Sequence, residues 1–245
     1  MSRVGIALLA CALGLPACTT ETVQKPKIVQ GTAVDHGLAL FSDPLASPSS
    51  LNAFSCATCH RATNDAGGAA VFTGAMLAGV TERPSFWAGQ ENDLLRSINH
   101  CRFYFMEAQK PWTVDDEEAK AMYAYLASLP PTTTAAVSFT VVASVADVPP
   151  GDAAAGARVF VNACQSCHGA VHTGEGRLTE RAVKLPDDTL VDHAEYSIED
   201  QRVVFVEKIR HGTFLGYAGS MPPYSKEALS DADLSDLLSY FQLYK

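Results

Sequence analysis

Two stretches of the chain share one pattern, CATCH at residues 56–60 and CQSCH at residues 164–168. In each stretch two cysteines stand three positions apart, and a histidine follows the second. On one turn of a helix, thiols at this spacing can bond the two vinyl groups of a single porphyrin, and the histidine can lie under its iron. The pattern C-x-x-C-H is the attachment signature of c-type haem. The residues concerned are Cys56, Cys59, His60, Cys164, Cys167 and His168.

Zinc sites and redox-active dithiols also use pairs of cysteines. Structural zinc needs four ligands gathered in one place, and a thioredoxin-like dithiol needs a strand, a turn and a helix around it. Neither context surrounds the two stretches. We therefore predict two covalently bound haem c groups, with His60 and His168 as ligands of their irons. Beyond residue 18, Cys101 is the only other cysteine, so no disulfide framework is expected.

The hydrophobic pattern predicts helices around both motifs. Asp152 can cap the free N–H groups of a helix that leads into Cys164, and Ser230 can cap a final helix. The apolar residues of these helices fall on one side at helical spacing. The first half of the chain repeats part of this layout, with Tyr125 and Tyr240 at equivalent positions. Helices are expected at 153–164, 198–210 and 230–244, and at 93–98 and 114–129.

These patterns predict an all-α protein of two tandem domains joined by an extended linker. A chain of 245 residues is long enough for two small domains. The stretch PPTTT at 130–134 leads into the linker, and a run rich in β-branched residues follows. A linker this apolar is expected to lie across a domain surface rather than in free solvent. We place the domains at 31–133 and 148–245, and the linker at 134–147.

Each half resembles a class I cytochrome c domain. In the second half, the resemblance rests on the capped helix that runs into CQSCHG, on MPPY at 221–224, and on the terminal helix that ends with Tyr240 and Phe241. The pair of units is similar in plan to dihaem cytochromes c4. The resemblance implies an all-α haem protein that transfers electrons. One stretch departs from this plan, since residues 37–55 resemble the loop before the first haem of bacterial dihaem cytochrome c peroxidases.

The sixth ligand of each iron decides what that iron can do. Methionine leaves no open position for substrate and raises the reduction potential, which favours simple electron exchange. Met221 lies in the MPPY stretch, which resembles the distal loop of class I cytochromes, and is the predicted ligand of the second iron. Met106 precedes Tyr125 by the same 19 positions that separate Met221 from Tyr240. Met106 is therefore the predicted ligand of the first iron.

Cys101 is the alternative ligand of the first iron. The stretch NHCRFYFM at 99–106 resembles the N-x-C-x-x-x-x-M stretch of dihaem thiosulfate dehydrogenases, in which the cysteine binds the catalytic haem. A thiolate would lower the potential and could react with sulfur substrates. Here aromatic residues at 103–105 replace the small, polar residues of that family and would crowd a substrate. His100, Met76 and an open site are further alternatives.

The N-terminus predicts export. Residues 1–17 are expected to be a signal peptide, because Arg3 precedes an apolar run too short to span a membrane. LPAC at 15–18 resembles a bacterial lipoprotein box, in which Cys18 is acylated; ordinary cleavage is the alternative. Residues 18–30 then form a tether. The chain is expected on the periplasmic side of a bacterial membrane, held by this lipid anchor. A net charge of -9 argues against nucleic acid as a partner.

The expected function is electron relay between redox partner proteins by an exported dihaem c-type cytochrome, and no catalytic residue is assigned. The alternative is a dihaem oxidoreductase of the thiosulfate dehydrogenase type, with a catalytic haem bound by Cys101. In that case Arg83, Arg96 and Arg102 could hold an anionic substrate. Solvated surface arginines would explain the same three residues equally well.

Overall fold

The computed structural model describes residues 32–63, 68–131, 135–140, 142–216, 219 and 221–244. The expected signal peptide, the tether and Cys18 lie outside these residues. The helices and turns named in the described ranges include no strand, and Phe86 and Glu91 form an isolated bridge. The predicted all-α class is therefore confirmed. Among the described helices, none combines the length and the apolar character needed to cross a membrane.

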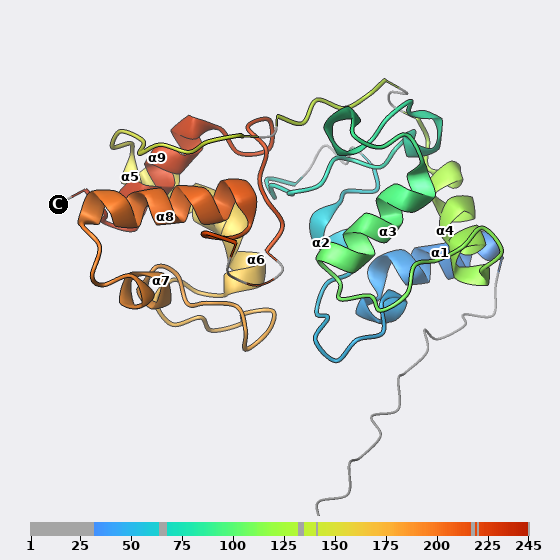
Figure 1. The fold of residues 1–245 in the computed structure, drawn as a ribbon, viewed down its shortest axis with the longest axis horizontal. Coiled ribbons are helices and arrows are strands. Elements are labelled where there is room, and N and C mark those ends of the chain that lie inside the picture. The colour runs from blue at the N-terminus through green and yellow to red at the C-terminus, as the bar shows by residue number, and fades with distance from the viewer. Residues whose placement is uncertain are drawn as a thin grey trace, which may run out of the picture.

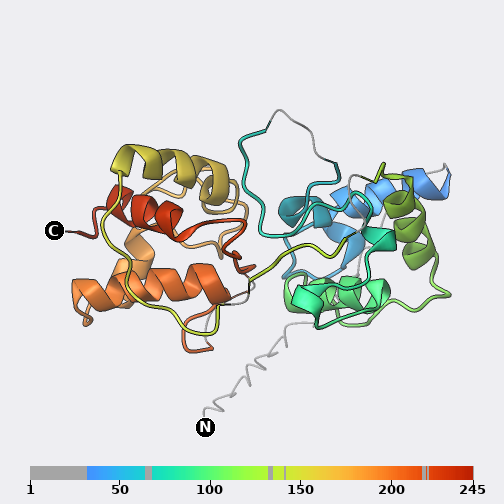
Figure 2. The same ribbon diagram turned by 90° about the horizontal axis from the view of Figure 1, so that it is seen from above.

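The helices form two lobes (Figure 1), which are also separate when seen from above (Figure 2). The first lobe contains α1 (Ala33–Ser42), α2 (Cys56–Cys59), α3 (Leu94–Tyr104) and α4 (Glu117–Ser128). The second contains α5 (Ala153–Val159), α6 (Gln165–His168), α7 (Asp187–Asp192), α8 (Ile198–His211) and α9 (Asp231–Tyr240). Short 3-10 turns lie at Pro44–Ala46, Val80–Glu82 and Trp87–Gly89, and a π-helical turn joins α5 to α6 at Phe160–Cys164.

Each lobe has its own apolar core. Leu40 and Met122 are fully buried in the first core, and Leu234 and Leu238 are fully buried in the second. Burying one such side chain contributes about 1.5–3 kcal/mol. The two cores form within separate parts of the chain, so each lobe supports its own haem motif.

In each lobe the first helix crosses the last. α1 packs against α4, and α5 packs against α9. The first crossing places Phe41 against Tyr125 with ring centroids 5.3 Å apart, and the second places Phe160 against Tyr240 at 5.8 Å. Tyr125 and Tyr240 therefore occupy equivalent positions, as the internal repeat predicts.

In the second lobe the two predicted N-cap residues cap their helices. Asp152 accepts a hydrogen bond from the backbone N–H of Ala154 at 2.8 Å, and Ser230 accepts one from that of Asp233 at 3.1 Å. The ends differ more from the expectations. α3 continues to Tyr104, beyond the expected 98. α4 begins three residues later than 114, and α9 ends at 240.

The interpretation of residues 37–55 as a loop is wrong for its first part. Residues 37–42 belong to α1, the counterpart of α5. Thr32 starts this helix with a capping box: its hydroxyl accepts from the N–H of Asp35 at 3.4 Å, and the Asp35 carboxylate accepts from the N–H of Thr32 at 3.1 Å. The first lobe therefore has the same leading helix as the second.

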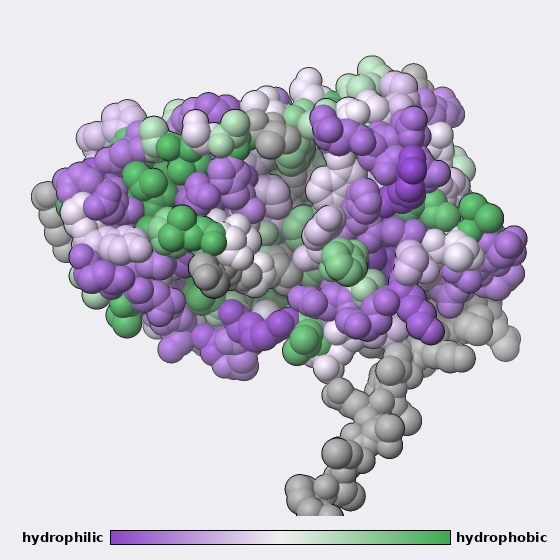
Figure 3. All heavy atoms as spheres, viewed as in Figure 1, coloured by the Kyte–Doolittle hydropathy of each residue, from purple (hydrophilic) through white to green (hydrophobic). Residues whose placement is uncertain are grey.

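The linker lies across the second lobe. Val145 packs against the second core, as does Val148 at the start of the second domain. Thr140 donates its backbone N–H and its hydroxyl to the Glu227 carboxylate at 2.9 and 2.5 Å. The linker therefore covers a domain surface, as its apolar composition predicts. Elsewhere the visible face of the molecule is mostly hydrophilic, with smaller hydrophobic groups between (Figure 3).

Candidate haem sites

The first motif forms a single helical turn, α2. Ser55 precedes it, and its N–H donates to the Thr58 hydroxyl at 3.0 Å, while the N–H of His60 closes the turn on the carbonyl of Cys56 at 2.9 Å. This turn brings both cysteines and the histidine to one side, because Cys56, Cys59 and His60 all line the same cavity.

The His60 ring is held in one orientation. Its Nδ1 lies 2.7 Å from the carbonyl oxygen of Ala75, and burial lowers the pKa of His60 below its ordinary value. A neutral ring that donates from Nδ1 to a carbonyl keeps the lone pair of Nε2 for a metal. Gly74 leaves room for this ring, since a Cβ at that position would stand 2.3 Å from His60 Cε1.

The second motif repeats this arrangement. Nδ1 of His168 lies 2.9 Å from the carbonyl oxygen of Val183, and burial again lowers the histidine pKa. In both lobes the carbonyl that orients the ring lies 15 residues after the histidine. Both imidazoles are thus oriented in the same way, and either could offer the lone pair of Nε2 to a metal.

A cavity of about 460 Å³ lies in the first lobe beside α2. Most of its wall is apolar, with Phe41, Leu94 and Leu126 among the lining residues. Arg83 and Arg102 also line it, each less than a tenth exposed, and their Nε atoms have no hydrogen-bond partner among the described residues. Two thiols, a neutral imidazole, an apolar wall and two buried cations fit haem c, whose macrocycle is apolar and whose side chains include carboxylates.

Met106 and Cys101, the two main candidates for the sixth ligand of the first iron, both line this cavity. Met106 is 3% exposed. Burial raises the pKa of Cys101 to about 12, which disfavours a free thiolate. His100 and Met76 are absent from the described lining, and the carbonyl of Met76 accepts from Arg83 at 2.6 Å. The structure is therefore compatible with either Met106 or Cys101 as the sixth ligand of the first iron.

The aromatic residues that follow Cys101 do not all crowd the cavity. Phe103 and Tyr104 are 65% and 59% exposed, and of the three only Phe105 lines the described wall. Phe105 stacks on Trp87, with ring centroids 6.2 Å apart. The expectation that residues 103–105 would all crowd a substrate is therefore wrong for two of them.

The arginines named as substrate candidates separate into two groups. Arg83 and Arg102 lie in the cavity wall, and Arg102 packs over the Trp112 ring at 3.9 Å. Arg96 instead forms an ion pair with Glu91 at 2.9 Å and has an exposed side chain. Of the three arginines, only Arg96 is explained by a solvated surface position.

Met221 lies in the second lobe, half-buried and packed against the second core together with Cys164. The loop after it is firmly held: the Tyr224 N–H donates to the carbonyl of Ile209 at 2.8 Å, and its hydroxyl donates to that of Ala163 at 2.5 Å. Ala163 precedes the first cysteine of the second motif. The same tyrosine thus fixes the Met221 segment to the second motif. The thiols of Cys164 and Cys167, the His168 imidazole and the Met221 thioether form a donor set that also fits haem c.

Two features of the first cavity escaped sequence reasoning. Linker residues 136–139 line it, and so do Pro222 and Pro223 of the second lobe. Contacts over such sequence distances leave no local signal in the chain. Figure 1 places α2 and α6 on the facing sides of the two lobes. The described cysteines form no disulfide, as expected, and no group of three or more His, Cys, Asp or Glu residues in the described ranges suits another metal.

This chain is similar to a known protein family and, distantly, to a solved structure. A thiosulfate dehydrogenase (TsdBA) from Marichromatium purpuratum, solved in its as-isolated form, aligns with a TM-score of 0.40 and 17% identity. The alignment covers 90% of this chain and 49% of that one, so this chain spans about half of the solved chain's length. No curated protein matches. The family model described as cytochrome C oxidase, cbb3-type, subunit III, matches residues 43–126 and 151–241. The match covers more than half of the chain in two tandem cytochrome c segments, and the chain therefore belongs to this family.

Proposed function

We propose that this protein is an exported dihaem c-type cytochrome that relays electrons between redox partner proteins. Cytochrome c domains transfer electrons through covalently bound haem. The observation that carries the relay is the meeting of the two attachment motifs at the lobe interface. Figure 1 places α2 and α6 on the facing sides of the two lobes, and Pro222 and Pro223, which follow Met221, line the same cavity as Cys56 and Cys59.

Direct contacts fix this interface. The N–H of Val71 in the first lobe donates to the carbonyl of Asn162 in the second at 2.8 Å. Asn162 lies in the turn that leads into Cys164. Redox groups bound at both turns would share one chain across this contact, which favours electron transfer within the molecule over collision with a second molecule.

Each side chain of the two sites has a defined role in this proposal. Cys56, Cys59, Cys164 and Cys167 hold two porphyrins, His60 and His168 are the proximal ligands, and Met106 and Met221 are the sixth ligands. When bound, haem c supplies one-electron exchange between ferrous and ferric iron. The carbonyls of Ala75 and Val183 keep the imidazoles oriented, and the apolar walls exclude water.

The proposal includes the extents of the parts and their place in the cell. We assign the domains to residues 31–133 and 148–245, with the linker at 134–147 between them. Residues 1–17 act as a signal peptide, Cys18 carries lipid, and residues 18–30 tether the domains at the periplasmic face of the membrane. Partners are redox proteins rather than nucleic acid, in keeping with the acidic net charge.

The second candidate function is an oxidoreductase of the thiosulfate dehydrogenase type. The observation in its favour is that Cys101 lines the first cavity together with the buried Arg83 and Arg102. In this reading Cys101 replaces Met106 as ligand, and the two guanidinium groups face an anionic substrate. Turnover with thiosulfate that is abolished by Cys101→Gly would establish this function.

The relay is tested by fast reduction of the holoprotein. After a substoichiometric pulse of reductant, electrons should redistribute between the two haems at a rate independent of protein concentration. The methionine-to-ferric-iron absorption band should have the strength of two sites in the wild type and of one site in Met106→Ala or Met221→Ala. A redistribution rate proportional to protein concentration would refute the intramolecular relay.

A further inference from the structure

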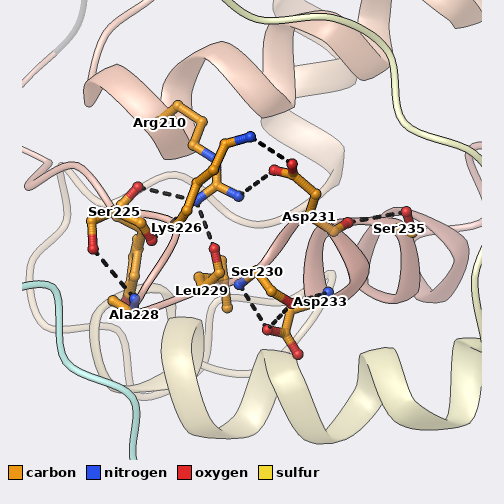
Figure 4. A network of polar contacts seen from close by, with 10 residues as sticks. Arg210, Ser225, Lys226, Ala228, Leu229, Ser230, Asp231, Asp233 and Ser235 are labelled. Carbon is orange, nitrogen blue, oxygen red and sulfur yellow. Dashed lines mark hydrogen bonds and ion pairs between the residues drawn. The ribbon is translucent and has the colours of Figure 1, made fainter. Parts of the chain in front are cut away.

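A buried guanidinium organises the loop that follows Met221. The side chain of Arg210, on α8, is 1% exposed. Its Nη1 lies 3.2, 3.1 and 2.7 Å from the carbonyl oxygens of Tyr224, Ser225 and Leu229, and its Nη2 lies 2.8 Å from the Asp231 carboxylate (Figure 4). Four contacts from one side chain thus gather a stretch of eight residues around the end of α8.

This stretch also makes an ion pair at the surface. Asp231 also accepts from Lys226 at 2.8 Å, but that pair is about half exposed (Figure 4). Exposed pairs of this kind contribute little to stability, whereas an unmatched buried charge is costly. The backbone carbonyls of the loop therefore take the place of water around the buried guanidinium of Arg210.

The loop of residues 221–231 reaches both haem sites. Met221, its first residue, is the proposed ligand of the second iron, and the next two residues, Pro222 and Pro223, line the cavity of the first lobe. Glu227, in the middle, holds Thr140 at the end of the linker stretch 136–140. Residues 136–139 of that stretch line the same cavity.

We infer that Arg210 is a positioning residue for both haem sites, because it holds the loop 221–231. At the second site the loop places Met221. At the first site it places Pro222, Pro223 and, through Glu227, the linker residues that line the cavity. This inference rests on the proposed function, because it takes Met221 as a ligand. Within the described residues, Arg210 makes no polar contact with either set of proposed haem-binding residues. Its effect is transmitted by the loop.

The test uses the holoprotein and four variants. Arg210→Met removes all four contacts, and Arg210→Lys retains the charge with fewer donors. Lys226→Met is the matched control, since it removes only the exposed partner of Asp231. Met221→Ala reports the absorption band of the second site. Losing a hydrogen bond to a charged group shifts a local equilibrium by about ten- to a hundredfold.

Two readouts follow the loop without depending on activity. Hydrogen exchange at the Tyr224 amide reports the loop, and exchange at the Thr140 amide reports the linker stretch that Glu227 holds. A third readout is the rate at which added imidazole binds at the first haem. Arg210→Met should speed exchange at both amides by about tenfold or more and raise the imidazole rate. Arg210→Lys should lie between this variant and the wild type, and Lys226→Met should match the wild type.

The inference is overturned if Arg210→Met is folded and leaves both amides and the imidazole rate unchanged. It is also overturned if the Tyr224 amide changes while Thr140 and imidazole binding do not, because the coupling to the first site would then be absent. If Arg210→Met does not fold, Asp231→Asn removes the carboxylate contact of Arg210 together with the exposed Lys226 pair, which Lys226→Met tests alone, and should give the same changes at smaller size. An absorption band that keeps its full two-site strength in Met221→Ala would refute the proposed ligand, while the two amides would still decide the role of Arg210.

Discussion

Gly156 on α5 lies directly against the backbone of Asp236 on α9. A Cβ built at Gly156 would stand 2.0 Å from the carbonyl oxygen of Asp236 and 2.8 Å from Cβ of Tyr240. The first lobe has the same relationship: a Cβ at Gly37 would stand 2.1 Å from the carbonyl oxygen of Ala121. Both contacts are with backbone, which cannot swing away as a long side chain can. The helix crossing of each lobe therefore requires glycine.

Replacing Gly156 with alanine should separate α5 from α9 and destabilise the second lobe by about 3 kcal/mol, the upper part of the range for overpacked cores. Denaturant unfolding of the holoprotein, followed by far-ultraviolet circular dichroism and by haem absorption, measures the loss. Gly219→Ala is the control, because a Cβ there meets no atom of the described residues within 4 Å. Equal midpoints for Gly156→Ala and the wild type would contradict the close crossing.

The same pair of crossings shows how much the sequence could predict. The haem motifs, the all-α class and the equivalence of Tyr125 and Tyr240 follow from local patterns and the internal repeat. α1 was missed, although its signals were present: Thr32 and Asp35 form a capping box, and Gly37 precedes Phe41 by four residues, as Gly156 precedes Phe160. The resemblance of residues 37–55 to a loop before the haem masks these short-range signals.

The candidate site was predictable where its residues are close in sequence and not where they are distant. C-x-x-C-H identifies both attachment turns, yet the carbonyls of Ala75 and Val183 that orient the imidazoles carry no side-chain signature. Pro222, Pro223 and the linker reach the first cavity only because the two lobes meet. Tertiary contact of this kind depends on packing between whole domains, which no local pattern encodes.

Asp147 on the linker and Arg202 on α8 form an ion pair that joins the linker to the second lobe. We call this pair the clamp and expect it to weaken in acid. Nε of Arg202 lies 2.9 and 3.0 Å from the two Asp147 oxygens, and Nη1 donates to the Leu243 carbonyl at 2.9 Å. The hydrogen bonds from Arg202 hold the pKa of Asp147 below its ordinary value of 3.8. The stabilisation is therefore present above this ordinary value and is lost as the pH falls through the lower, folded-state pKa.

Asp147→Asn should cost about 2 kcal/mol near neutral pH, as expected for a hydrogen-bonded charged group with a nearly buried partner. The difference from the wild type should shrink in acid, which unfolding curves at several pH values measure. Glu180→Gln is the control, since Glu180 pairs with Arg177 from an exposed position, and it should change stability little. A difference that grows as the pH falls would have the wrong sign for this clamp.

His211 predicts the opposite pH dependence. Its Nδ1 lies 3.0 Å from a Glu207 oxygen, and its Nε2 is bonded to the carbonyl of Val142. Both partners are acceptors, so only the imidazolium can donate to both at once. Glu207 in the first place, helped by the Val142 carbonyl, raises the pKa of His211 above its ordinary value of 6.5.

Because the folded-state pKa is raised, the stabilisation is fully present below pH 6.5 and is lost as the pH rises through the higher folded-state value. His211→Gln should therefore destabilise the protein in mild acid by under about 1 kcal/mol, the usual size for a partly exposed pair. The loss should disappear at alkaline pH. In a Glu207→Gln background the pH dependence should flatten, and a slope that persists there would assign the effect to another group.

Gly74 gives the sharpest test of the first haem site. A Cβ at this position would stand 2.3, 2.4 and 2.7 Å from Cε1, Nδ1 and Nε2 of His60, so Gly74→Ala must push the imidazole from its place. The thiols of Cys56 and Cys59 are untouched, so the variant should keep the mass of both haems. Its first iron should lose its proximal ligand, which absorption and electron paramagnetic resonance would show as one high-spin site beside one unchanged low-spin site. Gly68→Ala is the control, because the closest atom to a Cβ there is the end of the Arg61 side chain at 3.7 Å. If Gly74→Ala instead retains two low-spin irons with wild-type spectra, then the orientation of His60 described here does not belong to the haem-bound protein.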